Sequence, residues 1–117
     1  MTETVQARLQ AGLLTGLRDD NGICRFSAIP YAAPPGGALR FAPPEPVRWE
    51  GPRDATRPGP VPPQLPSRLR GAMGDFDAPQ SEDCLHLTVW TPAADAQRRP
   101  VCLLYTSDAA DDSLRVD

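Results

Sequence analysis

Three residue types that form hydrolytic triads lie close together in this sequence, namely Ser81, Asp83 and His86. In a triad an acid orients the histidine, and the histidine takes a proton from the serine hydroxyl that attacks a carbonyl carbon. The three side chains must converge, with nucleophile and base about 3 Å apart. On an extended chain Asp83 and His86 point to opposite faces. We therefore interpret this run as a loop leading into a strand, with His86 on its exposed face.

Other residues that could do chemistry are sparse. His86 is the one histidine, and no G-x-S-x-G motif occurs. Neither Gly36-Gly37 nor Gly71-Ala72-Met73-Gly74 combines a preceding strand with a following helix, so we expect turn glycines and no phosphate loop. Asp75 and Asp77 could be imagined as a calcium or acid/base pair, but they have no further oxygen ligands beside them. The sequence predicts neither a metal site nor a cofactor.

Charge is concentrated at one end of the chain. The 15 acidic and 12 basic residues give a net charge of −3, and every basic residue is arginine. Residues 108–117 hold four aspartates and one arginine, so the remainder is neutral. A neutral body without a basic stripe argues against nucleic-acid and anionic-membrane partners. The longest apolar run, residues 101–105, is far shorter than the roughly 20 residues of a membrane-spanning helix.

The N-terminus and the cysteines predict a compartment. The first residues lack the apolar stretch and basic start of a secretory signal peptide. Cys24, Cys84 and Cys102 form no C-x-x-C motif and have no histidine at metal-ligand spacing, so we expect free thiols. These features predict a cytoplasmic protein without disulfides.

The elements that would position these residues are mainly strands. Apolar and polar residues alternate from Val5 to Leu9, and Asn21-Gly22 lies between the apolar runs 13–17 and 23–26. Because both turn residues tolerate positive φ, this pattern favours a hairpin. We predict an antiparallel meander over about residues 4–29.

A proline-rich stretch follows, from residue 30 to about 80, and predicts a long irregular segment. Its large apolar side chains are candidates for buried anchors, with Trp49 the foremost: Tyr31, Leu39, Phe41 and Trp49. It also contains two matches to polyproline-II ligand motifs, R-x-x-P-x-x-P at 57–63 and P-x-x-P-x-R at 63–68. Such matches arise easily in a proline-rich chain.

Two further strands are predicted near the end. Leu85, Leu87 and Val89 alternate with polar or exposed positions up to Thr91-Pro92. Residues 101–105 form a continuous apolar run typical of a fully buried central strand. Residues 93–100 form the polar connection between them.

Several ordered motifs resemble one family. These are FSAIPYAAPP at 26–35, LRFAPP at 39–44, WEG at 49–51, DAT at 54–56, PQ at 63–64 and, above all, SEDCLHLTVW at 81–90. Together they are similar to the N-terminal segment of type-B carboxylesterases, over roughly residues 4–101.

The resemblance implies an incomplete α/β-hydrolase fold, of the α/β class: an N-terminal antiparallel meander and first core strands around the proline-rich segment. It implies hydrolysis of small-molecule carboxylic esters by a Ser-His-acid triad in the complete family. It further implies a structural ion pair between Arg40 and Glu82, although two independent surface charges remain an alternative. Ala28 stands where the family has glycine, and Pro62 stands where secreted members carry a cysteine.

The last segment, residues 102–117, departs from the family. The resemblance places an oxyanion-hole His-Gly-Gly turn at Thr106, Ser107 and Asp108. A carboxylate there would oppose a developing oxyanion. We expect residues 102–117 to be a non-family tail, disordered or artefactual.

We therefore expect an N-terminal fragment of a serine esterase that is inactive as this chain, since it has no identifiable nucleophile, catalytic histidine, acid or oxyanion glycines. Apolar faces at Leu87, Val89 and residues 101–104 should stay exposed. One alternative is an interaction module presenting residues 57–68, and another is a truncated product without function.

Overall fold

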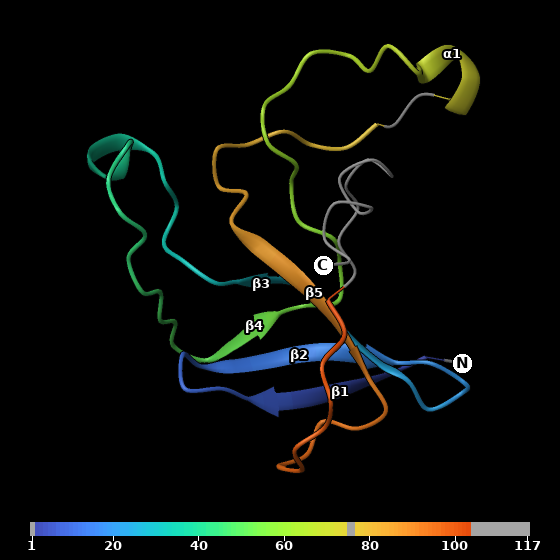
Figure 1. The fold of residues 1–117 in the computed structure, drawn as a ribbon. Coiled ribbons are helices and arrows are strands. Elements are labelled where there is room, and N and C mark those ends of the chain that lie inside the picture. The colour runs from blue at the N-terminus through green and yellow to red at the C-terminus, as the bar shows by residue number, and fades with distance from the viewer. Residues whose placement is uncertain (1, 75–76, 104–117) are drawn as a thin grey trace, which may run out of the picture.

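A single five-stranded sheet organises the chain (Figure 1). The computed structural model describes residues 2–74 and 77–103. The strands are β1 (Glu3–Arg8), β2 (Leu13–Arg18), β3 (Cys24–Pro30), β4 (Pro52–Asp54) and β5 (His86–Thr91). A 3-10 turn η1 (Gly37–Leu39) and a single-turn helix α1 (Arg70–Met73) interrupt the connections. The sheet order is β1-β2-β3-β5, and β4 pairs with β2.

The first three strands form the predicted antiparallel meander. β1 pairs with β2 along its whole length, from Glu3 opposite Arg18 to Arg8 opposite Leu13. The β2–β3 turn is closed by Asp19, whose Oδ1 accepts the backbone N–H groups of Asn21 and Ile23, each at 2.9 Å. Gly22 adopts a φ of +82°, but Asn21 does not share the positive φ expected for both residues. The aspartate cap makes a second positive φ unnecessary.

β5 is the predicted strand at residues 85–91, and it pairs antiparallel with β3. The register shifts between Phe26 and Ile29, where Ala28 takes a φ of +54°. This bulge lies at the position where the resemblance implies glycine, and positive φ is costly for a residue with a Cβ. On β5 the expected exposure of Leu87 and Val89 is confirmed, at 43% and 39%.

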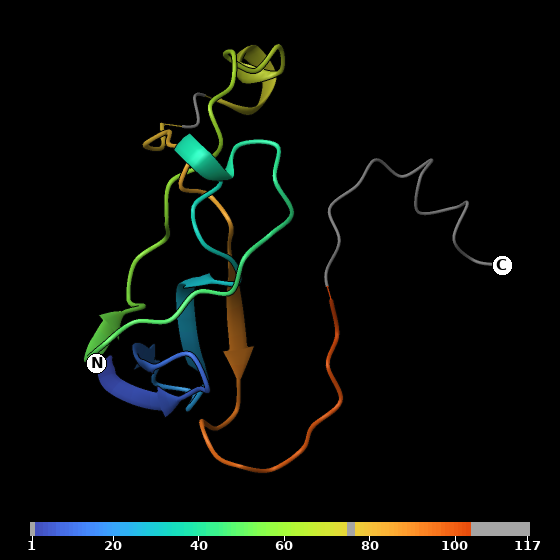
Figure 2. The same cartoon turned by 90° about the vertical axis from the view of Figure 1, so that its left-hand side faces the viewer.

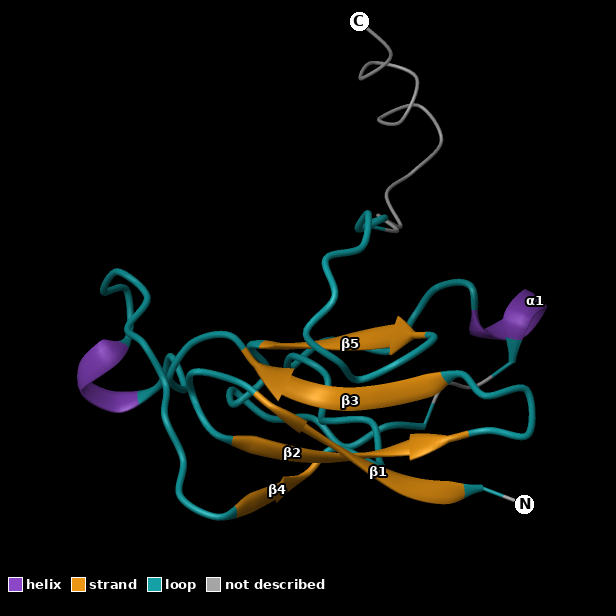
Figure 3. Cartoon of the chain, turned by 90° about the horizontal axis from the view of Figure 1, so that it is seen from below, coloured by secondary structure: helices purple, strands orange, loops and turns teal. Residues whose placement is uncertain are grey.

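The core is small and lies on one face of the meander. Its buried members are Leu14, Cys24, Phe26 and Ala55, ringed by half-buried apolar side chains. β2 has β1 along one edge, while its other edge pairs with β3 at Leu17–Arg18 and with β4 at Leu13–Thr15. Figure 3 shows β2 lying between these neighbours. β4 is parallel to β2 and brings Ala55 into the core.

The proline-rich segment leaves the sheet in two excursions, one carrying η1 and one carrying α1, and both rise above the strands in Figures 1 and 2. Trp49 is a docked aromatic as predicted, because it packs against the core and its Nε1 donates to the carbonyl of Leu13 at 2.8 Å. Leu39 is half-buried. The prediction that Tyr31 and Phe41 are buried is wrong, since they are 57% and 96% exposed. No described element covers the excursions on which they lie.

The chain after β5 stands off the sheet, as Figure 2 shows. The predicted buried strand at 101–105 does not form over its described part, where Val101 and Leu103 are 93% and 84% exposed. A strand buried on both faces needs neighbouring strands and covering helices, and residues 101–103 have none beside them. Residues 104 and 105 lie outside the described part, as does almost all of the tail at 102–117. Among the described residues, no helix has the length and apolar character to cross a membrane.

Candidate functional site

The three triad-type residues lie near one another but do not converge. Ser81 Oγ accepts the backbone N–H of Asp83 at 3.0 Å, which forms a local turn before β5. Asp83 is exposed, while Ser81 is half-buried. No hydrogen bond joins these three side chains in the described structure. Their arrangement is that of a loop leading into a strand.

His86 is held by the proline-rich segment. Its Nε2 lies 2.8 Å from the carbonyl oxygen of Pro60. A carbonyl only accepts, so Nε2 carries the proton and donates it. The prediction that His86 occupies an exposed strand face is wrong, because residues 59–60 cross it and leave the ring half-buried. A Cβ added to Gly59 would lie 2.5 Å from His86 Nε2, so glycine permits this approach.

The structure brings Arg40 and Glu82 together. Arg40 Nη1 donates to Glu82 Oε1 at 2.5 Å, across 42 residues of sequence. Both side chains are 56% exposed, so the pair contributes about 1 kcal/mol or less. The Arg40 guanidinium also lies 5.2 Å from the ring centre of Phe41. The pair connects the residue after η1 to the approach of β5.

The polyproline matches differ in accessibility. Val61 is fixed on both sides, because its N–H donates to Pro79 at 2.9 Å and its carbonyl accepts from Ser81 at 2.9 Å. This contact falls inside the match at 57–63. Residues 62–70 are exposed throughout, and Leu65 is 88% exposed. The match at 63–68 is therefore the more accessible of the two.

The glycine candidates lie at two short helical turns, η1 and α1. Gly37 begins η1 and Gly74 follows α1, both with positive φ. Asp77 is exposed, and Asp75 lies outside the described residues. Within residues 2–74 and 77–103, no group of three or more metal-ligating side chains forms a cluster.

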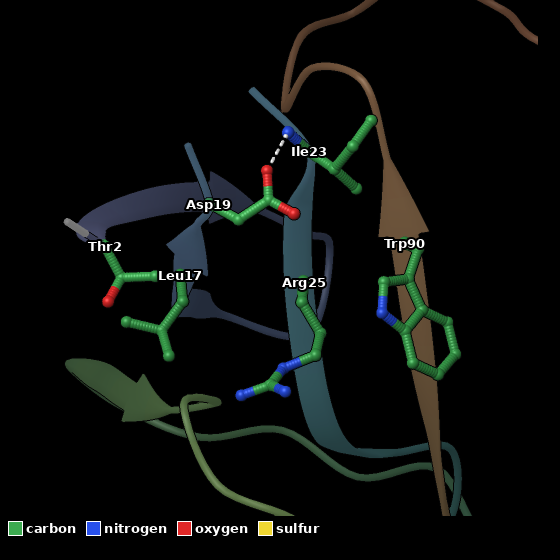
Figure 4. Close-up of a pocket in the computed structure, with 6 residues that line it drawn as sticks. All are labelled: Thr2, Leu17, Asp19, Ile23, Arg25 and Trp90. Carbon is green, nitrogen blue, oxygen red and sulfur yellow. Dashed lines mark hydrogen bonds between the residues drawn. The ribbon is translucent and has the colours of Figure 1, made fainter. Parts of the chain in front are cut away.

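A hollow of about 140 Å³ lies beside β3 and the adjoining ends of β2 and β5 (Figure 4). It is lined by Thr2, Leu17, Asp19, Ile23, Arg25 and Trp90. The Asp19 carboxylate is already used by the turn, and Arg25 Nη2 donates to the carbonyl of Thr56 at 3.2 Å. The hollow has no nucleophile paired with a base, so it offers no hydrolytic chemistry.

Sequence reasoning missed a bidentate ion pair after β5. Arg99 donates Nη1 to Asp95 Oδ1 at 2.5 Å and Nη2 to Oδ2 at 2.8 Å. The hydrogen bonds from Arg99 lower the pKa of Asp95 from 3.8 to about 2. The spacing of four residues between Asp95 and Arg99 was the one signal in the sequence for this ion pair. Outside a helix, however, residues four positions apart are not expected to be in contact.

Comparison with known proteins identifies the family of the chain. The model of the carboxylesterase family matches residues 2–109. Phenmedipham hydrolase of Pseudarthrobacter oxydans is 43% identical over 100 residues, covering 81% of this chain and 20% of that protein. The para-nitrobenzyl esterase of Bacillus subtilis is 42% identical over 83 residues, 70% of this chain and 17% of that protein. Human neuroligin-2 is 39% identical over 90 residues, 62% of this chain and 10% of that protein.

Solved structures give the same result for the fold. A PNB esterase superposes with a TM-score of 0.65 at 41% identity, over 78% of this chain and 18% of that one. The carboxylesterase of Geobacillus stearothermophilus gives 0.64 at 38% identity, over 81% and 18%. The chain spans between a tenth and a fifth of the length of these relatives. Its sheet is an incomplete part of their α/β-hydrolase fold, and the chain belongs to the carboxylesterase family.

Proposed function

We propose that residues 4–101 form the N-terminal edge of a serine esterase, and that the complete enzyme hydrolyses small-molecule carboxylic esters with a Ser-His-acid triad. The family match over residues 2–109 carries this proposal. The names of the relatives in Pseudarthrobacter oxydans and Bacillus subtilis, a hydrolase and an esterase, support it. We further propose that this chain alone has no esterase activity.

The side-chain geometry supports inactivity of this chain. The Nε2–H of His86 donates a hydrogen bond to the carbonyl oxygen of Pro60. Because this nitrogen carries the proton, it is not available as a base. Ser81 Oγ accepts from the backbone of Asp83. A nucleophile requires a base within hydrogen-bond reach, and no described side chain forms a hydrogen bond with Ser81 Oγ.

A chimera tests the proposal directly. Residues 4–101 would replace the matching segment of the para-nitrobenzyl esterase, and hydrolysis of p-nitrophenyl acetate would be followed. We expect a folded, active enzyme, because the segment supplies strands and no catalytic group. A chimera that folds, shown by circular dichroism, yet has lost activity at least 100-fold would contradict the proposed role.

A second chimera, with a later junction, tests whether residues 102–109 can replace the corresponding family sequence. When the replacement extends to residue 109, Thr106, Ser107 and Asp108 occupy the oxyanion-hole turn. Loss of even one oxyanion donor costs roughly 10²–10³ in turnover, so we expect this chimera to be almost inactive. Asp108→Gly alone should restore little, since the neighbouring positions also differ. Equal activity of the two chimeras would show that residues 102–109 belong to the functional family sequence.

The isolated chain has its own control. We expect its rate with p-nitrophenyl acetate to equal that of Ser81→Ala. A rate that falls in Ser81→Ala and in His86→Gln would overturn the assignment of inactivity.

A second candidate function is supported by the exposure of residues 62–70. The match at 63–68 presents Pro63, Pro66 and Arg68 to a polyproline-binding groove. A fluorescence titration with an SH3 domain would give micromolar affinity that is lost in Pro63→Ala/Pro66→Ala. The matched control is Pro43→Ala/Pro46→Ala, which changes prolines outside both motifs. Equal affinity of the two double variants would exclude the motif.

The three free cysteines, Cys24, Cys84 and Cys102, support a reducing compartment. We propose the cytoplasm on this ground. Fractionation of cells producing the complete protein would test it, and recovery from the medium would contradict it.

A further inference from the structure

The excursion that carries α1 closes on itself at its base, and we call residues 62–79 the α1 loop. At the base Val61 and Gln80 pair as a parallel bridge. The N–H of Val61 donates to the carbonyl of Pro79, and the N–H of Ser81 donates to the carbonyl of Val61, both at 2.9 Å. Figure 1 shows the loop rising from the sheet with α1 at its far end. These closing contacts do not involve any strand of the sheet.

A single hydrogen bond fastens the base of the α1 loop to the sheet. His86 is the first residue of β5, and its Nε2 donates to the carbonyl of Pro60 at 2.8 Å. In the part of the chain that the structure describes, no other hydrogen bond joins residues 58–80 to a strand. Apart from the chain that leads to β4 and β5, His86 is therefore what holds the loop in place.

Gly59 makes room for this contact. A Cβ added to Gly59 would lie 2.5 Å from His86 Nε2 and 2.8 Å from its Cδ2, so the ring packs directly against the backbone. Gly59 is not among the glycines with a positive φ. Its backbone conformation is therefore open to other residues, and the approach of the ring is what requires glycine. Both Gly59 and Pro60 are half-buried.

We propose that His86 is a positioning residue that anchors the α1 loop to the sheet, and that the loop swings on its two ends as one closed unit when this hydrogen bond breaks. The closure has three hydrogen bonds, because the N–H of Gln64 also donates to Gln80 Oε1 at 3.2 Å. The anchor has one, and one such bond changes an equilibrium about fivefold. The anchor therefore breaks before the closure does. The inference rests on contacts within this chain and does not depend on the proposed esterase activity.

The primary experiment measures the distance between the α1 loop and β1 in the full chain by double electron–electron resonance. Nitroxide labels are attached at Leu65→Cys and Gln6→Cys, two exposed positions. The parent chain for this experiment carries Cys84→Ser and Cys102→Ser, while Cys24 is buried and stays unlabelled. We expect a narrow distance distribution in the parent.

Two variants of His86 separate the hydrogen bond from packing. His86→Leu keeps an apolar side chain beside Gly59 but has no donor, whereas His86→Gln keeps an N–H that can donate to Pro60. We expect the distance distribution to be at least twofold wider in His86→Leu than in the parent, and to return to the parent width in His86→Gln. Equal widths in the parent and in His86→Leu, or a failure of His86→Gln to restore the parent width, would overturn the proposal.

Amide hydrogen exchange tests whether the loop stays closed while it moves. In His86→Leu the amides of Val61 and Ser81 should exchange within twofold of their parent rates. The Tyr31 amide, which donates to Leu85 at 3.2 Å, reports the attachment of β5 and should also be unchanged. Faster exchange at Val61 and Ser81 would show that His86 closes the loop instead of anchoring it. Faster exchange at Tyr31 would show that His86 supports the sheet, and either result contradicts the proposal.

Chemical modification tests the anchor without replacing His86. Because His86 is the one histidine of the sequence, its reaction with diethyl pyrocarbonate can be followed without interference from other imidazoles. Gly59→Ala drives a Cβ into the ring and should raise the reaction rate at least fivefold. The matched control is Gly71→Ala, whose added Cβ meets nothing within 4 Å and should leave the rate unchanged. Equal rates in the two glycine variants would exclude the anchor.

Discussion

The contact between Gly12 and Trp49 predicts an unusually costly glycine substitution. Gly12 has a φ of +155°, and a Cβ built on it would lie 2.5 Å from Trp49 Nε1 and 2.7 Å from two ring carbons. No shift of a few tenths of an ångström removes such an overlap. In Gly12→Ala the indole must leave its position over the end of β2.

The expected magnitude follows from what the indole then loses. Its hydrogen bond to Leu13, 2.8 Å long, is worth about 1 kcal/mol. Lost burial of a half-buried tryptophan adds about 1–2 kcal/mol, and backbone strain adds about 1 kcal/mol. We expect Gly12→Ala to lower the opening free energy of the sheet by about 3–4 kcal/mol. Native-state hydrogen exchange at the Ala55 amide measures this quantity.

Two controls separate packing from backbone strain. Gly22 also has a positive φ, +82°, but nothing lies within 4 Å of its added Cβ. Gly22→Ala should therefore cost only the strain, about 1 kcal/mol. In a Trp49→Ala background the overlap is gone, so Gly12→Ala should cost about as little there. Equal costs at Gly12 and Gly22, or a cost of Gly12→Ala that stays at about 3–4 kcal/mol in the Trp49→Ala background, would refute the reasoning.

Three further predictions follow from local geometry. Ala28→Gly should slow exchange of the β3 amides, stabilising the bulge by about 1 kcal/mol, because Ala28 holds a φ of +54°. A double-mutant cycle with Arg40→Gln and Glu82→Gln should give a coupling of about 1 kcal/mol or less that shrinks in high salt, since both side chains are 56% exposed. NMR titration of Asp95 should give a pKa near 2 that returns toward 3.8 in Arg99→Gln; because the folded pKa is lowered, the stabilisation is present above about pH 4 and is lost as pH falls through 2.

The meander and β5 could be predicted because their sequences alternate clearly and because Asn21-Gly22 marks a turn. β4 could not, since Pro52–Asp54 has only three residues and pairs with a strand 39 positions earlier, from Leu13 to Pro52. The strand expected at 101–105 shows the opposite error, a strand that the sequence predicts and the described residues 101–103 do not form. An apolar run indicates burial only when the rest of the sheet is present to bury it.

The candidate site was predictable in part and for different reasons. The side chains of Ser81, Asp83 and His86 do not converge. The period-2 alternation of a strand predicts this, because it turns Asp83 and His86 to opposite faces. The half-buried environment of His86 depends on Pro60, 26 positions away, and no local pattern encodes that contact. The prediction for Phe41 fails because a large aromatic side chain is usually buried, whereas here no described element packs over the excursion that carries it.

The placement of β3 between β2 and β5 sets an order for folding. β1, β2 and β3 are consecutive hairpin partners, so they can pair as soon as the first 30 residues leave the ribosome. β5 can join only after a connection of more than 50 residues has been closed, from Pro30 to His86. Closing a loop of that length costs on the order of 3–4 kcal/mol in entropy. The outer edge of β3 is therefore bare throughout synthesis of the proline-rich segment, and this interval is when a nascent chain is most exposed to mispairing with its neighbours on a polysome.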